Sequence, residues 1–343
     1  MRRIWLLCVR AYISAGMFFY FRRIKVFGIE NIPKNKSVLL LSNHQNALLD
    51  ALLIATKSNR YSYFLTRAGV FQKPFVAKLL KSLQMLPVYR VRDGWGNLSN
   101  NNAIFETCSE LLNKKECVVI FPEGNHNLMR RVRPLSKGFT RIVLNTFEKY
   151  PNIDLQLLPV GLNYQDAVKF PDSTAIYFGK TIEAKNYISG DKNNDVVSLK
   201  SKIQSEISQL TTNIPKDDYE VILGKLKLME TDFLNPKAVN ACIDFNFKDC
   251  KIKKVRRNMF LEYFSKFLLI LIFPIPYILW KFLIKPRIKE IEFLSTFRFA
   301  AVVTLAPVWL IILFLAFGVT LSWSLASLCL IAIIIISIVA VKA

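Results

Sequence analysis

Short apolar runs alternate with longer amphipathic segments over the first two thirds of the chain. Runs of apolar, β-branched and aromatic residues bounded by polar turns are typical of buried strands. Five such runs predict strands: Ser37–Ser42, Tyr61–Thr66, Cys117–Phe121, Leu155–Leu162 and Thr174–Phe178. Four stretches with helical spacing separate them: Leu49–Thr56, Phe75–Leu83, Asn101–Leu112 and Lys137–Glu148. This alternation predicts an α/β fold, with a central, mainly parallel or mixed sheet flanked by helices.

The end of the chain has a different pattern. Residues Phe299 to Val341 hold almost no charge and are long enough for two spans of about 20 residues, with a turn at Gly318 to Trp323. We therefore expect a transmembrane hairpin at 299–343. Residues 260–284 are also apolar, but Pro274 and Pro276 interrupt them. Because proline breaks the helical ladder, a kinked, re-entrant or interfacial element is favoured there over a simple span.

These patterns divide the chain into four parts. Residues 1–25 mix aromatic and arginine side chains as an amphipathic membrane anchor does, in the form of an interfacial helix. Residues 26–235 form the α/β domain, in which a polar loop at Ser189–Asp195 precedes a solvated helix ending at Leu210. Residues 236–298 are a linker and a kinked membrane-associated segment. Basic residues precede the first predicted span and follow the second, so both ends of the hairpin, and the α/β domain, are expected on the cytoplasmic face.

The net charge and the cysteine content indicate which binding partners, disulfides and metal sites to expect. The formal net charge of +22 requires an anionic partner, such as nucleic acid, anionic lipid or a phosphorylated substrate. The basic run Lys251–Arg257 directly precedes the apolar region, which favours membrane lipid over nucleic acid. The six cysteines include no Cys-x-x-Cys pair, and there are only two histidines. We predict neither a disulfide nor a metal site.

A polar turn after the first predicted strand holds the strongest candidate chemistry. His44 lies in this turn, and Asp50 follows six residues later. A neutral imidazole accepts a proton from an alcohol, and a carboxylate on its other nitrogen fixes the tautomer. In a regular helix two residues six apart would point about 120° away from each other, so His44 has to lie before the helix. A polar loop whose histidine caps a helix is the competing interpretation.

A second polar turn follows the predicted strand at Cys117–Phe121. It reads Phe121-Pro-Glu-Gly124, in which Glu123 is suited to hydrogen-bond a polyol and Gly124 lets the backbone approach a ligand. The competing interpretation is an ordinary β-turn.

Together these segments resemble known motifs. Asn43-His44 with Asp50, and Phe121-Pro-Glu-Gly124, are similar to motifs one and three of the glycerolipid acyltransferases, which include the lysophosphatidate acyltransferases. Leu86-Pro-Val-Tyr-Arg90 resembles the second motif and Leu158-Pro-Val-Gly161 the fourth, in the family's order, so the resemblance covers about residues 26–164.

The resemblance implies acyl transfer from acyl-CoA or acyl carrier protein to a glycerol-phosphate hydroxyl, as in phosphatidic acid synthesis. His44 would act as general base with Asp50 behind it, and Arg90 would contact the phosphate. Asn43, Glu123 and Gly124 would belong to the substrate-binding motifs. No metal, cofactor or covalent enzyme intermediate is implied, and the partners would be membrane lipids, the thioester donor and the acceptor.

Two departures from the family pattern bear on the acceptor. Five residues separate His44 from Asp50 where four are usual, which resembles fungal-type glycerol-3-phosphate or dihydroxyacetone-phosphate acyltransferases. After Gly124 the family often has Thr-Arg-Ser, whereas this chain has Asn125-His126-Asn127. Nearby cations available for phosphate are Arg67, Arg130, Arg131 and Arg133, of which Arg67 and Arg133 are the candidates, and His126 is a further possible substrate contact.

The sequence leaves both the acceptor and the class of function open. The acceptor of the acyl group is glycerol-3-phosphate, its 1-acyl product, or another lysolipid such as an amino-acid lipid. A non-catalytic membrane lipid-binding protein is a second class of function. A transporter is disfavoured, because the two predicted spans contain no acidic residue.

Overall fold

One mixed sheet forms the centre of the protein. The computed structural model describes residues 2–90, 99, 101–248, 250, 252 and 259–342. Its strands are β1 (Phe21–Phe27), β2 (Ser37–Ser42), β3 (Ser62–Arg67), β4 (Met85–Val88), β5 (Cys117–Ile120), β6 (Leu155–Tyr164), β7 (Asp172–Phe178) and β8 (Ile182–Glu183). The spatial order is β1-β7-β6-β2-β5-β3-β4, with β8 beside β6. Only β6 with β7 and β6 with β8 pair antiparallel among the described strands, which confirms the predicted mainly parallel or mixed sheet.

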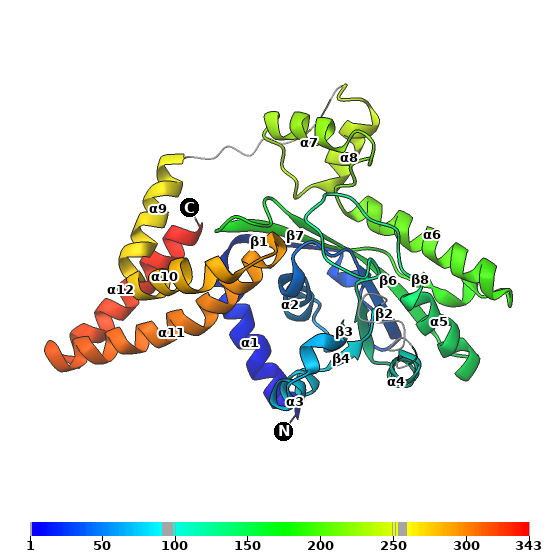
Figure 1. Ribbon diagram of the computed structural model, residues 1–343, viewed down its shortest axis with the longest axis horizontal. Coiled ribbons are helices and arrows are strands. Elements are labelled where there is room, and N and C mark those ends of the chain that lie inside the picture. The colour runs from blue at the N-terminus through cyan, green and yellow to red at the C-terminus, as the bar shows by residue number, and fades with distance from the viewer. Residues whose placement is uncertain are drawn as a thin grey trace.

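Helices cover both faces of this sheet (Figure 1). The helices of the domain are α2 (Ala47–Lys57), α3 (Pro74–Ser82), α4 (Asn101–Asn113), α5 (Gly138–Lys149) and α6 (Lys192–Leu210). Short helical turns lie at Ile29–Asn31, Ala68–Phe71 and Ala184–Tyr187. All five predicted strands and four predicted helices are present, with ends shifted by at most two residues. Strands β1, β4 and β8 were not predicted, and β1 crosses the boundary expected between residues 25 and 26.

Alternation along the central strand β2 divides the core into two layers. Leu39 and Leu41 point to one face, against α4, α5 and α6, whereas Val38 and Leu40 point to the other, against α1 (Arg2–Tyr20) and α2. All four side chains are fully buried, as expected of a central strand covered on both faces.

Helix α6 differs from the solvated helix expected from the sequence. Leu199, Ile203 and Ile207 recur every four residues along it and are fully buried in the core, so one face packs on the sheet. The helix also begins earlier, because Asp191 caps it by accepting hydrogen bonds from the backbone N–H groups of Asn193 and Asn194.

A small helical unit packs beside the sheet domain (Figure 1). It contains α7 (Tyr219–Leu228) and α8 (Pro236–Asp244) around a core that includes Leu226 and Val239. A disulfide joins Cys242 to Cys250, so the prediction of no disulfide is wrong. A turn after α8, with Asn246 and Phe247 in the left-handed region, carries the chain back towards the helix, and the two Cα atoms lie 4.9 Å apart. Most of the basic run Lys251–Arg257 lies outside the described residues.

The apolar C-terminal region forms helices that extend away from the sheet (Figure 1). They are α9 (Met259–Ile272), α10 (Pro274–Ile278) with a π-helical continuation at Leu279–Ile284, α11 (Leu294–Thr320) and α12 (Trp323–Lys342); short turns lie at Lys285–Arg287 and Ile291–Phe293. Residues Ile291–Thr320 and Trp323–Lys342 are each long and apolar enough to cross a membrane. The segments Phe260–Ile272 and Pro274–Arg287 meet at a bend of 108°, at the position where the sequence predicted a kink.

Aromatic donors bond two backbone carbonyls that have no helical partner. The carbonyl of Ile272 is at the end of α9, where the chain bends before Pro274, and the indole N–H of Trp309 donates to that carbonyl at 2.9 Å. Pro307 likewise leaves the carbonyl of Val303 without its helical donor, and the hydroxyl of Tyr12 donates to it. These bonds join α11 to α9 and to α1.

Candidate active site

His44 and Asp50 meet at the carboxyl end of the central strand β2. The strand ends at Ser42 and α2 begins at Ala47, so His44 lies in the connecting turn and Asp50 in the first turn of the helix. Nδ1 of His44 lies 2.8 Å from Oδ2 of Asp50. This strand-turn-helix geometry brings together two side chains that a continuous helix would separate.

The carboxylate of Asp50 is fully buried and held by three donors. Oδ2 also accepts a 2.8 Å hydrogen bond from the backbone N–H of Asn46, and Oδ1 accepts a 2.6 Å bond from the hydroxyl of Tyr164. Such donors stabilise a buried carboxylate that burial alone would disfavour. With Asp50 accepting from Nδ1, the other ring nitrogen of His44, Nε2, is the one left to accept a proton. No local pattern pointed to Tyr164, because this residue of β6 reaches Asp50 of α2 only through tertiary packing.

Three contacts fix the histidine turn. The ring of His44 stacks on that of Phe121 with centroids 4.1 Å apart, and the N–H of Asn127 donates to the carbonyl of His44 at 3.0 Å. The side-chain amide of Asn43 bonds both backbone groups of Leu162, at 3.0 and 2.7 Å. Asn43 therefore ties the turn to β6, and a direct contact of Asn43 with substrate stays a prediction.

The second predicted turn lies beside the first, after the adjacent strand β5. The N–H of Gly124 bonds the carbonyl of Phe121 at 3.1 Å, and Gly124 has a φ of +78°. Apart from its two chain neighbours, no described residue has a heavy atom within 4 Å of the position that a Cβ would take there, so the backbone conformation favours glycine.

Charged side chains converge on this turn. Nε of Arg133 lies 2.6 Å from Oε2 of Glu123, and the same guanidinium bonds both oxygens of Asn125. Arg90 donates to the carbonyl of Gly124 at 3.3 Å. Burial raises the pKa of Glu123, while Arg133 and His44 oppose that shift. The structure thus brings Arg90, Glu123, Gly124 and Arg133 into one cluster.

The remaining predicted cations have different surroundings. Arg67 is the last residue of β3 and is exposed. It pairs with Val88 of β4, which precedes Arg90 by two residues, so Arg67 and Arg90 lie at the same edge of the sheet. Arg130 is half-buried and donates to the carbonyls of Tyr164 and Gln165, and therefore has a mainly structural environment.

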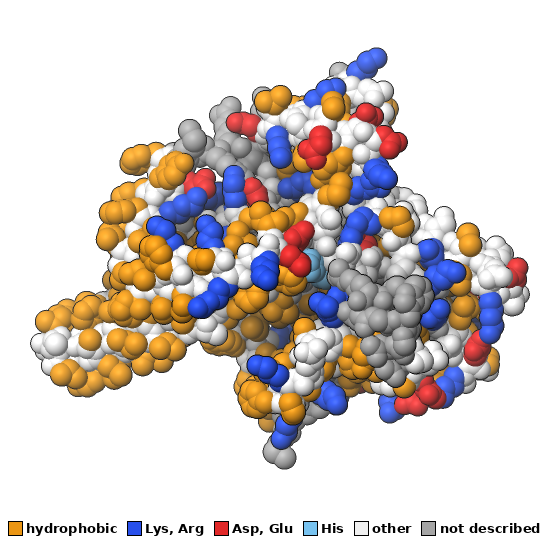
Figure 2. Space-filling view, in the orientation of Figure 1, with side chains coloured by type: hydrophobic (Ala, Val, Ile, Leu, Met, Phe, Trp, Pro, Cys, Tyr) orange, Lys and Arg blue, Asp and Glu red, His pale blue; other side chains and the backbone are white. Residues whose placement is uncertain are grey.

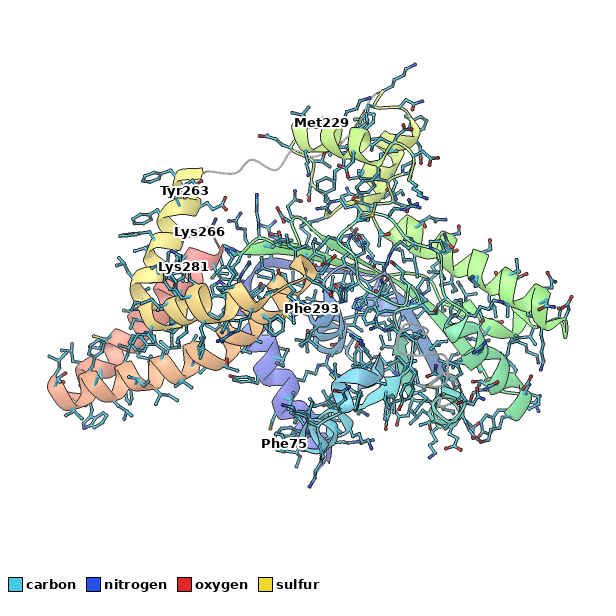
Figure 3. All side chains as sticks on the ribbon, viewed as in Figure 1. Phe75, Met229, Tyr263, Lys266, Lys281 and Phe293 are labelled. Carbon is cyan, nitrogen blue, oxygen red and sulfur yellow. A yellow bond between two sulfur atoms is a disulfide. The ribbon has the colours of Figure 1, made fainter. Side chains whose placement is uncertain are left out.

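His126 is a second histidine next to the first. Its ring lies edge-on to that of His44 with centroids 5.7 Å apart, and 4.5 Å from the ring of Phe293, which precedes α11. Burial, with the neighbouring His44, lowers the pKa of His126, and its buried Nδ1 has no hydrogen-bond partner among the described residues. Figure 2 shows a histidine at the centre of one face beside acidic side chains, and Figure 3 labels Phe293 near the middle of the molecule. The C-terminal helices therefore contact the site, which the sequence did not indicate.

Within the described ranges, no group of three or more His, Cys, Asp or Glu side chains is placed to hold a metal ion. The arrangement is a buried acid-histidine pair beside a cationic cluster. Its chemistry is that of a general base next to a site for an anionic group.

Comparison with known proteins gives consistent matches over this region. Residues 23–163 match the family described as Acyltransferase. Over 168 residues, 46% of this chain and 22% of the relative, the sequence is 26% identical to glycerol-3-phosphate O-acyltransferase 1 of Saccharomyces cerevisiae. Over 142 residues, 41% of this chain and 39% of the relative, it is 26% identical to a chloroplastic 1-acyl-sn-glycerol-3-phosphate acyltransferase of Brassica napus.

A crystal structure of the 1-acyl-sn-glycerophosphate acyltransferase of Thermotoga maritima aligns with a TM-score of 0.46 and 18% identity, covering 63% of this chain and 83% of that chain. The matched region spans less than two fifths of the length of each curated relative named above. It contains the turns that carry His44, Asp50, Arg90 and Glu123. The similarity of residues 23–163 to the Acyltransferase family and to these relatives supports a glycerolipid acyltransferase domain in this part of the chain.

Proposed function

We propose that this protein transfers a fatty acyl group from acyl-CoA or acyl carrier protein to the hydroxyl of glycerol-3-phosphate or 1-acyl-glycerol-3-phosphate. The observation that carries the proposal is the 2.8 Å contact between His44 and a buried Asp50 whose oxygens are held by Tyr164 and Asn46. Two family relatives, whose names give these two acceptors, support it. With 1-acyl-glycerol-3-phosphate the product would be phosphatidic acid, and with glycerol-3-phosphate it would be the precursor of phosphatidic acid.

The reaction needs one proton acceptor and no covalent enzyme intermediate. His44 Nε2 takes the proton of the acceptor hydroxyl while the hydroxyl oxygen attacks the thioester carbonyl. The new C–O bond forms and the C–S bond breaks, and the departing thiolate takes the proton from the His44 imidazolium, which returns to its neutral form. Asp50 stabilises the imidazolium that forms, through the contact at Nδ1.

The cationic cluster is the candidate site for the acceptor's phosphate. Arg90 and Arg133 bring guanidinium groups to the Glu123–Gly124 turn, beside the face of Phe121 that stacks on His44. Guanidinium groups suit phosphate oxygens, and Glu123 is suited to accept a hydrogen bond from a second hydroxyl. Arg67, at the same edge of the sheet, is a further phosphate candidate. The five-residue spacing between His44 and Asp50 favours glycerol-3-phosphate.

A second candidate acceptor follows from His126. This residue stands where the family often has arginine, and its buried Nδ1 has no partner among the described residues. A neutral imidazole can donate and accept hydrogen bonds but carries no charge. It therefore suits the headgroup of an amino-acid lysolipid better than it suits a bare phosphate.

We place the protein in a membrane with the α/β domain on the cytoplasmic side. Hydrophobic side chains cover the hairpin of α11 and α12, whereas charged side chains gather over the sheet domain (Figure 2). Both ends of the hairpin contact the domain: the hydroxyl of Ser295 in α11 donates to the carbonyl of Ala167 at 2.6 Å, and the ammonium of Lys342 bonds the carbonyls of Phe18 and Phe21 at 2.7 Å. The α1 helix and the bent segment at 260–284 would lie at the interface, an arrangement that the positive-inside rule favours.

The test is a transfer assay in detergent with labelled acyl-CoA or acyl carrier protein and three acceptors: glycerol-3-phosphate, 1-acyl-glycerol-3-phosphate and an amino-acid lysolipid. We expect product with one of the first two acceptors, and a loss of roughly 10²–10⁴-fold in kcat for His44→Ala. Thermal unfolding of the variant controls for misfolding. Undiminished product in His44→Ala would refute the mechanism, and lipid binding without product from any acceptor would support the non-catalytic alternative.

A further inference from the structure

An apolar groove of about 590 Å³ lies among the C-terminal helices, at a distance from the cluster described above. It is bounded by α1, α9, α10, α11 and α12, and its walls include Phe19, Leu269, Phe273, Val302 and Leu310. The two helices long enough to cross a membrane contribute much of its lining. Most of this lining is apolar and offers water few hydrogen-bond partners, so an apolar ligand suits it better.

The backbone around the groove is satisfied without water. The carbonyl of Ile272, at the end of α9, accepts a hydrogen bond from Trp309, and the carbonyl of Val303, which Pro307 leaves without its helical donor, accepts one from Tyr12. Both carbonyls therefore have partners within the helices, as a lipid-contacting surface requires.

Two cations line the same groove. The guanidinium of Arg298 lies 5.6 Å from the ring centroid of Trp280 and donates to the carbonyl of Val168 at 3.0 Å, and among the described residues it makes no ion pair. The ammonium of Lys266 pairs with Glu262 at 2.8 Å, and its side chain is 40% exposed. Tyr277 and Trp280 also line the groove, as aromatic side chains do at a membrane-water interface. An apolar groove with cations and interfacial aromatics matches an amphipathic anion.

Lys266 also connects the groove to a second, polar cavity of about 900 Å³. Charged residues of both signs line this cavity, including Arg130, Lys227 and Glu230. It also reaches Gln45, the neighbour of His44. Figure 3 shows Tyr263 and Lys266 on α9, with Lys281 on the segment that follows. A headgroup held at Lys266 would therefore leave the hydrocarbon groove and face an aqueous polar cavity.

We infer that this groove binds one acyl chain of an anionic phospholipid from the surrounding bilayer, with its phosphate held by Arg298 and Lys266. Charge complementarity selects this occupant. A second copy of the chain would have to supply both an apolar segment and an anion at one end, and bilayer lipid combines the two in one molecule. The inference goes beyond acyl transfer, because the site requires no reaction at His44.

The test counts lipids retained by the purified full chain. Native mass spectrometry in detergent, with titrated dioleoylphosphatidylglycerol or dioleoylphosphatidylcholine, should show one tightly held phosphatidylglycerol per chain. Phosphatidylcholine, whose headgroup carries its own cation, should bind about fivefold more weakly. Arg298→Gln and Lys266→Gln should each weaken phosphatidylglycerol binding about fivefold. Ala306→Phe, which fills the groove, should weaken the binding of both lipids.

Lys281→Gln is the matched control, because it removes the same charge from the same membrane segment but lines neither cavity. Its affinity for phosphatidylglycerol should equal that of the unsubstituted protein. Equal losses in Lys281→Gln and Lys266→Gln would mean diffuse surface attraction, and unchanged binding in the Arg298, Lys266 and Ala306 variants would overturn the site. A dimer in place of bound lipid would assign the groove to a second copy. Because binding is measured without turnover, each of these outcomes leaves the proposed acyl transfer untouched.

Discussion

The hydroxyl of Tyr164, the last residue of β6, donates a 2.6 Å hydrogen bond to Oδ1 of Asp50 on α2. The two residues are 114 positions apart in the chain. Their bond fixes the rotation of a buried carboxylate whose other oxygen meets His44. Tyr164 therefore acts as a positioning residue, since it reaches the proton-accepting histidine only through Asp50.

The first prediction concerns this bond. Tyr164→Phe keeps the ring and removes the donor, so Asp50 is less firmly held and the imidazolium is less well stabilised. We expect kcat to fall about tenfold with little change in KM, as for the loss of one hydrogen bond to a charged group. Steady-state kinetics in detergent measures the change.

Tyr177→Phe is the control, because it removes a hydroxyl from β7, the strand next to β6, without touching Asp50. The hydroxyl of Tyr177 donates instead to the carbonyl of Leu234 at 2.7 Å. Its kcat should stay within about twofold of the unsubstituted value. An unchanged kcat in Tyr164→Phe would show that Asp50 is held well enough by its other donors.

Local patterns in the sequence were enough to predict five of the strands and the pairing of His44 with Asp50. Strand β2 is a short run of leucine and valine, and the turn after it carries its chemistry within seven residues. Tyr164 and Phe293 were out of reach, because each meets the site only through tertiary packing. Helix α6 was predicted to be solvated because most of its residues are polar. Its apolar residues Leu199, Ile203 and Ile207 recur every fourth position and form the face that packs on the sheet.

Strand β1 was missed for a related reason. Its sequence Phe-Arg-Arg-Ile-Lys-Val-Phe combines cations with aromatic residues, which is also the composition of an interfacial segment. Only its parallel pairing with β7 distinguishes the two, and that partner lies about 150 residues later. The disulfide between Cys242 and Cys250 likewise depends on the turn after α8 and not on cysteine spacing.

The second prediction concerns the pair between Glu123 and Arg133. The side chain of Glu123 is only 3% exposed, so Arg133→Gln leaves a buried carboxylate without its cation and raises its pKa further. We expect a loss of about 3 kcal/mol in the free energy of unfolding. Glu123→Gln should cost less, because Arg133 is partly exposed and can be solvated.

A double-mutant cycle in thermal or denaturant unfolding measures the coupling. The variant with both substitutions should be more stable than Arg133→Gln alone, since no charge is then buried without a partner. Strictly additive losses would show that the two side chains are not energetically coupled.

The third prediction concerns the bend between α9 and α10. Trp309→Phe removes the indole N–H that bonds the carbonyl of Ile272, which has no helical donor. We expect a loss of about 1–3 kcal/mol in unfolding free energy, the cost of an unsatisfied buried acceptor. Trp323→Phe, whose ring packs over Gly318, is the aromatic control and should cost less.

The control also decides what the indole contributes. If Trp309→Phe costs no more than Trp323→Phe, the indole stabilises the helices by packing alone.

The last prediction concerns the pH dependence of stability. Asp172 is 5% exposed and Oδ2 has no hydrogen-bond partner among the described residues. Burial raises the pKa of Asp172 to about 8, against about 3.9 in an unfolded chain. Between these values the folded protein holds a proton that the unfolded chain releases. This contribution to stability is therefore complete below about pH 4 and is lost as the pH rises through about 8.

Asp172→Asn should remove that dependence. The amide oxygen still accepts the 2.9 Å bond from the N–H of Asp166, and no proton is exchanged on unfolding. The slope of unfolding free energy with pH, up to about 1.4 kcal/mol per pH unit from this group, should flatten between pH 5 and 7. The variant should therefore gain most over the unsubstituted protein near pH 8 and nothing near pH 4. Asp218→Asn, at an exposed position before α7, should keep the original slope. Equal slopes in Asp172→Asn and the unsubstituted protein would show that Asp172 is ionised in the folded state, with its charge balanced by Arg130, which acts to lower its pKa.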